Sequence, residues 1–131
     1  PERIHRADGS LRYQRIAYCE DMAGAYSAAA VVVCRAGAST IAEIATVGVA
    51  AVIIPWKDAA ENHQLTNAQW LTDAGAAVLL EESSLREATF IEVVGALISN
   101  RSAISRYEEK SFALGDVHRN CRIATIIESV A

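Results

Sequence analysis

Two short polar segments of this sequence have the residue types and spacing of a ligand site. In the first, the apolar run 30–34 ends in a turn of small residues and passes directly into an amphipathic helix that carries Glu43. Small residues let a ligand approach the backbone, and the free N–H groups and dipole of a helix N-terminus favour a phosphate. Glu43, about one turn along that helix, can then hold the two hydroxyls of a ribose.

The same residues also fit a purely structural role. In a capping box, the Thr40 side chain caps the helix and Glu43 reaches back to the Thr40 backbone N–H. That interpretation predicts that Glu43→Ala costs about 1 kcal/mol of stability and changes no ligand binding. The local pattern alone leaves both interpretations open.

The second segment gathers neutral polar side chains at the start of a later helix. His63 and Asn67 lie one helical turn apart and Gln64 flanks them, so all three lie near the N-terminal end of one face. Donors and acceptors of this kind suit the hydroxyls of a sugar. In the alternative, Asn62 caps the helix while His63 and Gln64 face solvent. No Ser or Cys nucleophile pattern supports His63 as a general base.

The composition of the chain limits the classes of protein to which it can belong. A chain of 131 residues with 52% hydrophobic residues is expected to form a single globular domain. Its net charge of −4 argues against general nucleic-acid binding. The absence of a long apolar run and of a secretory signal predicts a cytoplasmic protein. Three cysteines, without a C-x-x-C pair, predict reduced thiols, and we expect no metal and no cofactor.

The order of apolar runs and turn residues predicts an α/β fold. Strands and helices are expected to alternate over residues 13–80, and residues 83–131 are expected to be purely helical. Such alternation implies a Rossmann-like, mostly parallel sheet with helices on both faces, whose carboxyl edge holds the Gly37 turn and the loop 56–61. Strands are expected at 13–18, 30–34, 51–54 and 76–80, and helices at 21–29, 40–47, 62–74, from Ser84 onward, at 103–113 and at 116–130.

Taken together, the motifs resemble the C-terminal lobe of MurG-like UDP-N-acetylglucosamine transferases. This family adds GlcNAc to undecaprenyl-diphospho-muramoyl-pentapeptide, which converts lipid I to lipid II. The resemblance is close over residues 13–80 and looser in the C-terminal helices. It rests on Asp21-Met22, Cys34-Arg35-Ala36-Gly37-Ala38-x-Thr40-x-x-Glu43, Gly48, Pro55, His63-Gln64-x-x-Asn67-Ala68 and Ala74-Gly75-Ala76-Ala77.

The resemblance implies roles for particular residues of this chain. Glu43 would hold the ribose hydroxyls, and His63 and Gln64 would contact GlcNAc, with Asn67 supporting their loop. The Cys19 backbone would hydrogen-bond to the uracil. The segment packed around the uracil comprises Tyr18, Cys19 and Met22. The diphosphate and part of the sugar would meet backbone N–H groups and a hydroxyl from Ala38, Ser39 and Thr40.

The resemblance also implies what the chain does not carry. It corresponds to the second part of the C-terminal, donor-binding lobe of a GT-B-type enzyme, ending in a helical tail. The catalytic residues, the acceptor site and the membrane-facing surface would then lie in a missing N-terminal lobe, and this part alone would be inactive. The intact protein would be peripheral on the cytoplasmic face of the cell membrane. Alternatives are another UDP-sugar transferase, a non-catalytic UDP-sugar-binding subunit that needs a partner chain, or a small α/β domain with a well-capped rim.

Overall fold

A three-stranded parallel sheet forms the centre of the molecule. The computed structural model describes residues 2–5, 12–120 and 122–130. Strands β3 (Val32–Cys34), β4 (Ala51–Ile53) and β5 (Val78–Leu79) lie in the order β3-β4-β5, and both pairings are parallel. All three come from short apolar runs bounded by turn residues, as the sequence predicts. Their carboxyl ends therefore share one edge of the sheet.

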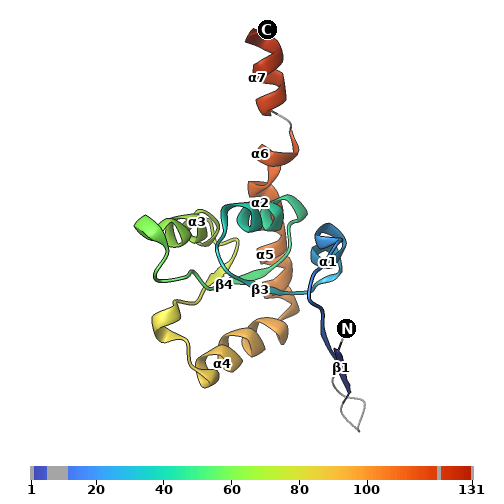
Figure 1. Cartoon of the computed structure of the whole chain (residues 1–131), viewed down its shortest axis with the longest axis vertical. Helices are drawn as coiled ribbons and strands as arrows, with labels where there is room; N and C mark the ends of the chain where they lie inside the picture. Colours follow the sequence, from blue (N-terminus) through green and yellow to red (C-terminus); the bar gives the residue numbers. More distant parts are fainter. Residues whose placement is uncertain (1, 6–11, 121, 131) are drawn as a thin grey trace.

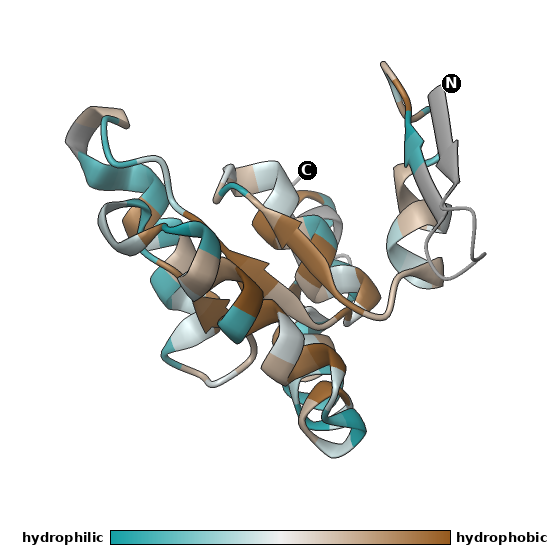
Figure 2. Ribbon diagram, turned by 90° about the horizontal axis from the view of Figure 1, so that it is seen from below, coloured by the Kyte–Doolittle hydropathy of each residue, from teal (hydrophilic) through white to brown (hydrophobic). Residues whose placement is uncertain are grey.

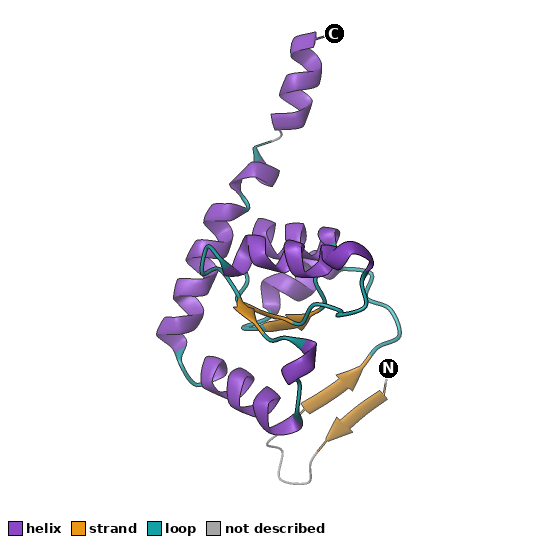
Figure 3. Ribbon diagram, turned by 90° about the vertical axis from the view of Figure 1, so that its left-hand side faces the viewer, coloured by secondary structure: helices purple, strands orange, loops and turns teal. Residues whose placement is uncertain are grey.

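Helices cover both faces of this sheet (Figures 1 and 3). Helices α1 (Met22–Ala28), α2 (Ala38–Val47) and α3 (His63–Thr72) pack on one face. Helices α4 (Glu87–Ile98) and α5 (Arg101–Leu114) cover the other, and the end of α5 reaches α2. The predicted Rossmann-like architecture is confirmed.

Strand β4 supplies the middle of the core. Ala51 and Ile53 point into the cluster beneath α2 and α3, whereas Val52 points toward α4 and α5, and all three are fully buried. A strand buried on both faces must be apolar at every position rather than at alternate ones. Figure 2 shows the resulting hydrophobic sheet between more polar helices.

The helix bounds differ from the sequence prediction at several ends. Helix α2 begins at Ala38, before the expected Thr40, and ends as expected at Gly48, which has φ +80° and donates to Ile44 O at 2.8 Å. A short 3₁₀ turn, η1 (Ala60–Asn62), precedes α3. The expected cap at Ser84 is wrong, because that residue ends the 3₁₀ turn η2 (Glu82–Ser84) and α4 starts only at Glu87.

The first strand expected in the sheet lies elsewhere. Strand β2 (Arg12–Arg15) pairs antiparallel with β1 (Glu2–His5), and this hairpin stands apart from the parallel sheet (Figures 1 and 3). Gln14 and the two arginines make β2 too polar for burial on both faces. The strand expected at 13–18 therefore ends early and does not join the sheet.

The predicted last helix, at 116–130, is two helices. Helix α6 (Asp116–Arg119) packs on α2, whereas α7 (Arg122–Val130) projects from the body of the molecule (Figure 1). Cys121, one of the predicted reduced thiols, lies outside the described residues. In the part of the chain that is described, none of the helices has the length and apolar character needed to cross a bilayer.

Candidate functional site

The two polar segments singled out in the sequence meet at the carboxyl edge of the sheet. Gln64 Oε1 accepts the backbone N–H groups of Ala36 and Trp56 at 3.2 and 3.0 Å. Asn67 Nδ2 donates to Ala36 O at 3.0 Å. Gln64 and Asn67 are three positions apart on α3, so both side chains reach the turn that precedes α2. The alternative in which Gln64 faces solvent is therefore wrong.

These contacts decide which atoms remain for a ligand. Because both partners of Gln64 Oε1 are N–H donors, the remaining polar atom of that carboxamide is its Nε2, a donor. His63 is exposed and places Nδ1 2.7 Å from Ala60 O, an acceptor, so Nδ1 carries the proton and a neutral ring leaves Nε2 as an acceptor. Asn62 makes no side-chain cap and has φ +54°, a left-handed conformation unusual for a residue with a side chain.

The N-terminus of α2 opens at the same edge. Gly37 occupies the N-cap position, and the first helical hydrogen bond runs from Ile41 N to Gly37 O at 3.0 Å. The amides of the three preceding residues have no acceptor within the helix. A capping box at Thr40 is wrong, because Thr40 lies inside the first turn and cannot be the N-cap. The free amides belong to Ala38, Ser39 and Thr40, the residues expected to meet a diphosphate.

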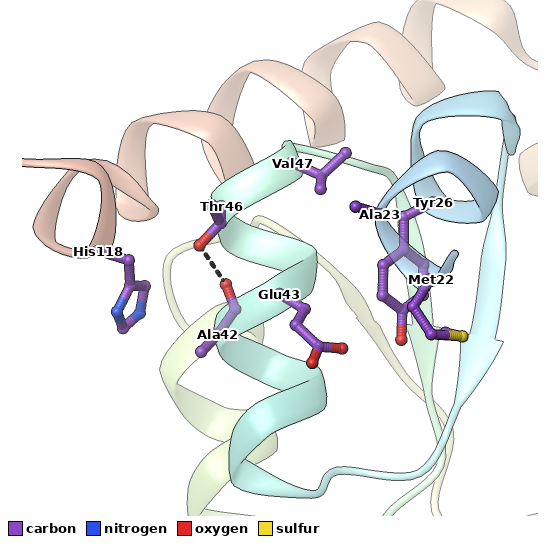
Figure 4. Close-up of a pocket in the computed structure, with 8 residues that line it drawn as sticks. All are labelled: Met22, Ala23, Tyr26, Ala42, Glu43, Thr46, Val47 and His118. Atoms are coloured by element: carbon purple, nitrogen blue, oxygen red, sulfur yellow. Dashed lines mark hydrogen bonds between the residues drawn. The ribbon is translucent and has the colours of Figure 1, made fainter. Parts of the chain in front are cut away.

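Glu43 borders a pocket of about 310 Å³ between α1 and α2. In Figure 4 its carboxylate projects from α2 toward Met22 and Tyr26 on α1. Burial, and then the nearby Glu43 carboxylate, raise the pKa of Tyr26, so this phenol stays protonated. The pocket is lined by Met22, Ala23, Tyr26, Ala42, Glu43, Thr46, Val47 and His118. Of the residues expected around the base, Met22 thus lies in the same pocket as Glu43.

The other two residues expected around a base lie in the segment before α1. The Tyr18 side chain is 81% exposed, and Cys19 is partly buried. Both Cys19 and Cys34 are free thiols. Burial raises the pKa of Cys34 to about 11, which keeps this residue in its neutral form within the core. Among the described residues, no group of three or more His, Cys, Asp and Glu side chains could hold a metal ion.

Sequence reasoning missed an ion pair at the rim. Arg35, directly after β3, contacts Glu82 at 2.6 Å, and Glu82 also accepts the Lys57 backbone N–H at 3.0 Å. The Arg35 hydrogen bond and then the Lys57 amide lower the pKa of Glu82. A signal was present, because opposite charges follow two strands of the predicted parallel sheet. The sheet order, with one strand between them, was the missing information.

His118 was also missed. It lies on α6, far along the chain from Glu43, yet it lines the same pocket and makes an edge-to-face contact with Trp70 at 5.7 Å between ring centroids. No sequence motif surrounds His118. Its position depends on the packing of α6 against α2, which only the tertiary structure reveals.

Known proteins share this architecture and sequence. The model of the glycosyltransferase family 28 C-terminal domain matches residues 2–120. A crystal structure of Acinetobacter baumannii MurG matches 75% of this chain and 28% of its own chain, with a TM-score of 0.70 and 40% identity. The chain is thus similar to one portion of a larger solved protein.

Curated relatives extend this likeness. Three of them carry the name UDP-N-acetylglucosamine--N-acetylmuramyl-(pentapeptide) pyrophosphoryl-undecaprenol N-acetylglucosamine transferase. The protein from Burkholderia ambifaria is 39% identical over a match that covers 88% of this chain and 31% of the relative. The protein from Halorhodospira halophila is 40% identical over a match that covers 88% of this chain and 32% of the relative. The relative from Coxiella burnetii is 56% identical over 53% of this chain and 20% of its own length. The chain spans about a third of the length of the first two. It belongs to the family of glycosyltransferase family 28 C-terminal domains.

Proposed function

We propose that this chain is the UDP-GlcNAc-binding part of an inverting glycosyltransferase of peptidoglycan synthesis. The whole enzyme would transfer GlcNAc to lipid-linked muramoyl-pentapeptide, converting lipid I to lipid II. The observation that carries the proposal is the convergence at one sheet edge of the free α2 amides and the Gln64 carboxamide, with Glu43 on the same helix. The names and identities of the relatives support the same substrate class.

The pocket beside Glu43 suits the nucleoside. Its walls are mostly apolar, as a base requires, and a single carboxylate is available for two neighbouring hydroxyls. We assign the ribose to Glu43 and the uracil to the side of Met22, with Tyr18 and the Cys19 backbone closing the site. The absence of a Thr40 capping box supports this role, because it leaves Glu43 without that structural function.

The start of α2 suits the diphosphate. Three successive amides and the positive end of a helix dipole favour phosphate oxygens. Ser39 and Thr40 each add a hydroxyl at this end. As the sugar leaves, negative charge grows on the UDP oxygens, so the same amides would stabilise the leaving group without reorganising.

The start of α3 suits the sugar. Gln64 Nε2 can donate to a hydroxyl or carbonyl oxygen, whereas His63 Nε2 can accept from a hydroxyl. Asn67 would act indirectly, because its Nδ2 already donates to Ala36 O. This chain would thus orient the donor, while the catalytic residues, the acceptor and the membrane surface would be met through another part of the enzyme. We propose that the enzyme is peripheral on the cytoplasmic face of the membrane.

Amide chemical shifts of the chain, titrated with UDP-GlcNAc, UDP and ADP, test this function. We expect shifts at Cys19, at residues 38–43 and at residues 63–64, with tighter binding of the uridine ligands. Glu43→Gln should weaken UDP binding about tenfold, the effect of one hydrogen bond to a charged group. Glu92→Gln makes the same charge change on α4, across the sheet, and should bind like the unsubstituted chain.

Either of two results would contradict the proposal. One is equal affinity for UDP and ADP, which would mean that the base is not recognised. The other is a folded sample without any shift at millimolar ligand.

A further inference from the structure

One carboxylate connects the loops that follow all three strands of the parallel sheet. Glu82 comes after β5, and its Oε1 lies 2.6 Å from Arg35 Nη2, which follows β3. Its Oε2 accepts the backbone N–H of Lys57, which follows β4, at 3.0 Å. We call this set of contacts, made by Glu82 with Arg35 and the Lys57 amide, the Glu82 clamp.

The Glu82 clamp holds the loop that contacts Gln64. Arg35 Nη1 donates to the carbonyls of Ile54 and Pro55, both at 3.3 Å. The next residue, Trp56, donates its backbone N–H to Gln64 Oε1 at 3.0 Å. Residues 54–57 are therefore held from one side by the Glu82 clamp and from the other by Gln64.

The energetics favour a local role for this ion pair. The side chains of Arg35 and Glu82 are 49% and 23% exposed, and pairs that contact water to this extent add little to global stability. Their contacts with backbone atoms, however, restrict where the loop can lie. Each Glu82 oxygen already accepts one hydrogen bond within the protein, Oε1 from Arg35 and Oε2 from the Lys57 amide.

We propose that Glu82 is a positioning residue of the sugar-binding end of the donor site. By holding Arg35 and the Lys57 amide, it keeps residues 54–57 against Gln64 and so orients the Gln64 carboxamide toward the sugar. This inference rests on the proposed function, because it assigns the sugar to that end of the site. The diphosphate and uridine ends depend on α2 and Glu43 instead.

The first experiment measures the loop without ligand. Hydrogen exchange and amide shifts of Ala36, Trp56 and Lys57 are compared in Glu82→Ala and Glu82→Gln. The matched controls are Glu81→Ala and Glu81→Gln, since Glu81 is exposed and its Oε2 contacts Ser83 Oγ at 3.3 Å. We expect Lys57 to exchange at least about tenfold faster in Glu82→Ala than in Glu81→Ala, because its amide loses a charged acceptor.

The conservative variant separates charge from hydrogen bonding. Glu82→Gln keeps an oxygen that can accept from Lys57 but loses the ion pair with Arg35, so its exchange should be intermediate. Equal exchange in the Glu82 and Glu81 variants would overturn the proposal.

The second experiment measures the donor. In Glu82→Ala the affinity for UDP should be nearly unchanged, while the affinity for UDP-GlcNAc should fall about tenfold. The additional affinity that the GlcNAc group gives to UDP-GlcNAc over UDP would then be lost. A merely structural role would weaken both ligands equally, and that result would overturn the inference while leaving the proposed function intact. An unsubstituted chain that binds no uridine ligand would overturn the proposed function and, with it, any role of Glu82 in donor binding.

Discussion

The two ends of α2 differ in whether the rest of the molecule supplies hydrogen-bond partners for their backbone groups. At its N-terminus, the amides of residues 38–40 lie ahead of the first helical hydrogen bond and open at the sheet edge. At its C-terminus, Ile44 O accepts from Gly48 N at 2.8 Å and from Ser111 Oγ at 3.3 Å. The carbonyls of Ala45 and Thr46 accept from Arg119 Nη1 at 3.3 and 3.0 Å.

This difference shows how a helix can be both anchored and available. The C-terminus of α2, its closed end, is bound by α5 and α6, which fix the position of α2 over the sheet. The N-terminus of α2, its open end, can then present its amides to the proposed diphosphate without moving, and preorganised donors are the most effective ones. Changes at the closed end should therefore cost stability, whereas changes at the open end should cost binding.

The largest effect is expected for Gly115→Ala at the closed end. A Cβ at Gly115 would overlap the Ala45 carbonyl oxygen, a backbone atom that cannot turn aside. We expect a loss of about 3 kcal/mol in the free energy of unfolding, measured by urea denaturation. Gly95→Ala is the matched control, since a Cβ there meets nothing within 4 Å and alanine should stabilise α4 by about 0.5–1 kcal/mol. Equal stability of the two variants would contradict close packing of Gly115 on α2.

Arg119→Ala should have the next largest effect. Besides its bonds to Ala45 and Thr46, the guanidinium lies 3.6 Å from the centroid of the Phe112 ring. Loss of a cation at a helix C-terminus, with its hydrogen bonds, should cost about 1–2 kcal/mol of unfolding free energy. Arg119→Lys should recover only part of this, because an ammonium lacks the planar fork. Full recovery by lysine would show that charge alone matters here.

Ala38→Pro tests the open end. Proline is tolerated at the first helical position, and Gly37 already has the extended ψ of 144° that a residue before proline needs. Stability should change by less than about 0.5 kcal/mol, while the loss of one N–H should weaken UDP binding about tenfold. Isothermal calorimetry would measure the affinity, with Ala38→Ser as the control that keeps the amide. Unchanged binding would mean that this amide does not contact the diphosphate.

Acidification should produce the smallest change, and we expect it in the loop held by the Glu82 clamp, at the sugar-binding end of the proposed site rather than at the N-terminus of α2. The pKa of Glu82 is lowered from its usual 4.5 by Arg35 and the Lys57 amide. A lowered carboxyl pKa means that the contribution of the Glu82 clamp is complete above pH 4.5 and is lost as the pH falls through the folded value, which lies lower. The Lys57 amide shift should therefore stay constant from pH 7 to about pH 5 and move below that range. A midpoint above pH 4.5 would contradict the ion pair.

Much of the fold could be predicted because its signals are local. The apolar runs that become β3, β4 and β5, the stop at Gly48 and the polar start of α3 all lie within a few residues. The start of α2 was placed late, because Thr40 and Glu43 match a capping pattern that competes with the Gly37 cap actually used. The hairpin β1–β2 was missed as a separate sheet, since a strand pattern does not identify its partner.

The sequence by itself determined the α/β class and the sheet edge at which the candidate site was expected, and its resemblance to a known family named the residues expected to meet a nucleotide sugar. Only the tertiary structure decided how these residues are held. It directed the Gln64 oxygen to the amides of Ala36 and Trp56, joined Arg35 to Glu82, and brought His118 to the pocket beside Glu43. The physical reason is the distance along the chain between the residues that interact. Helix and strand patterns depend on neighbours in sequence, whereas hydrogen bonds between loops depend on the order in which strands pair.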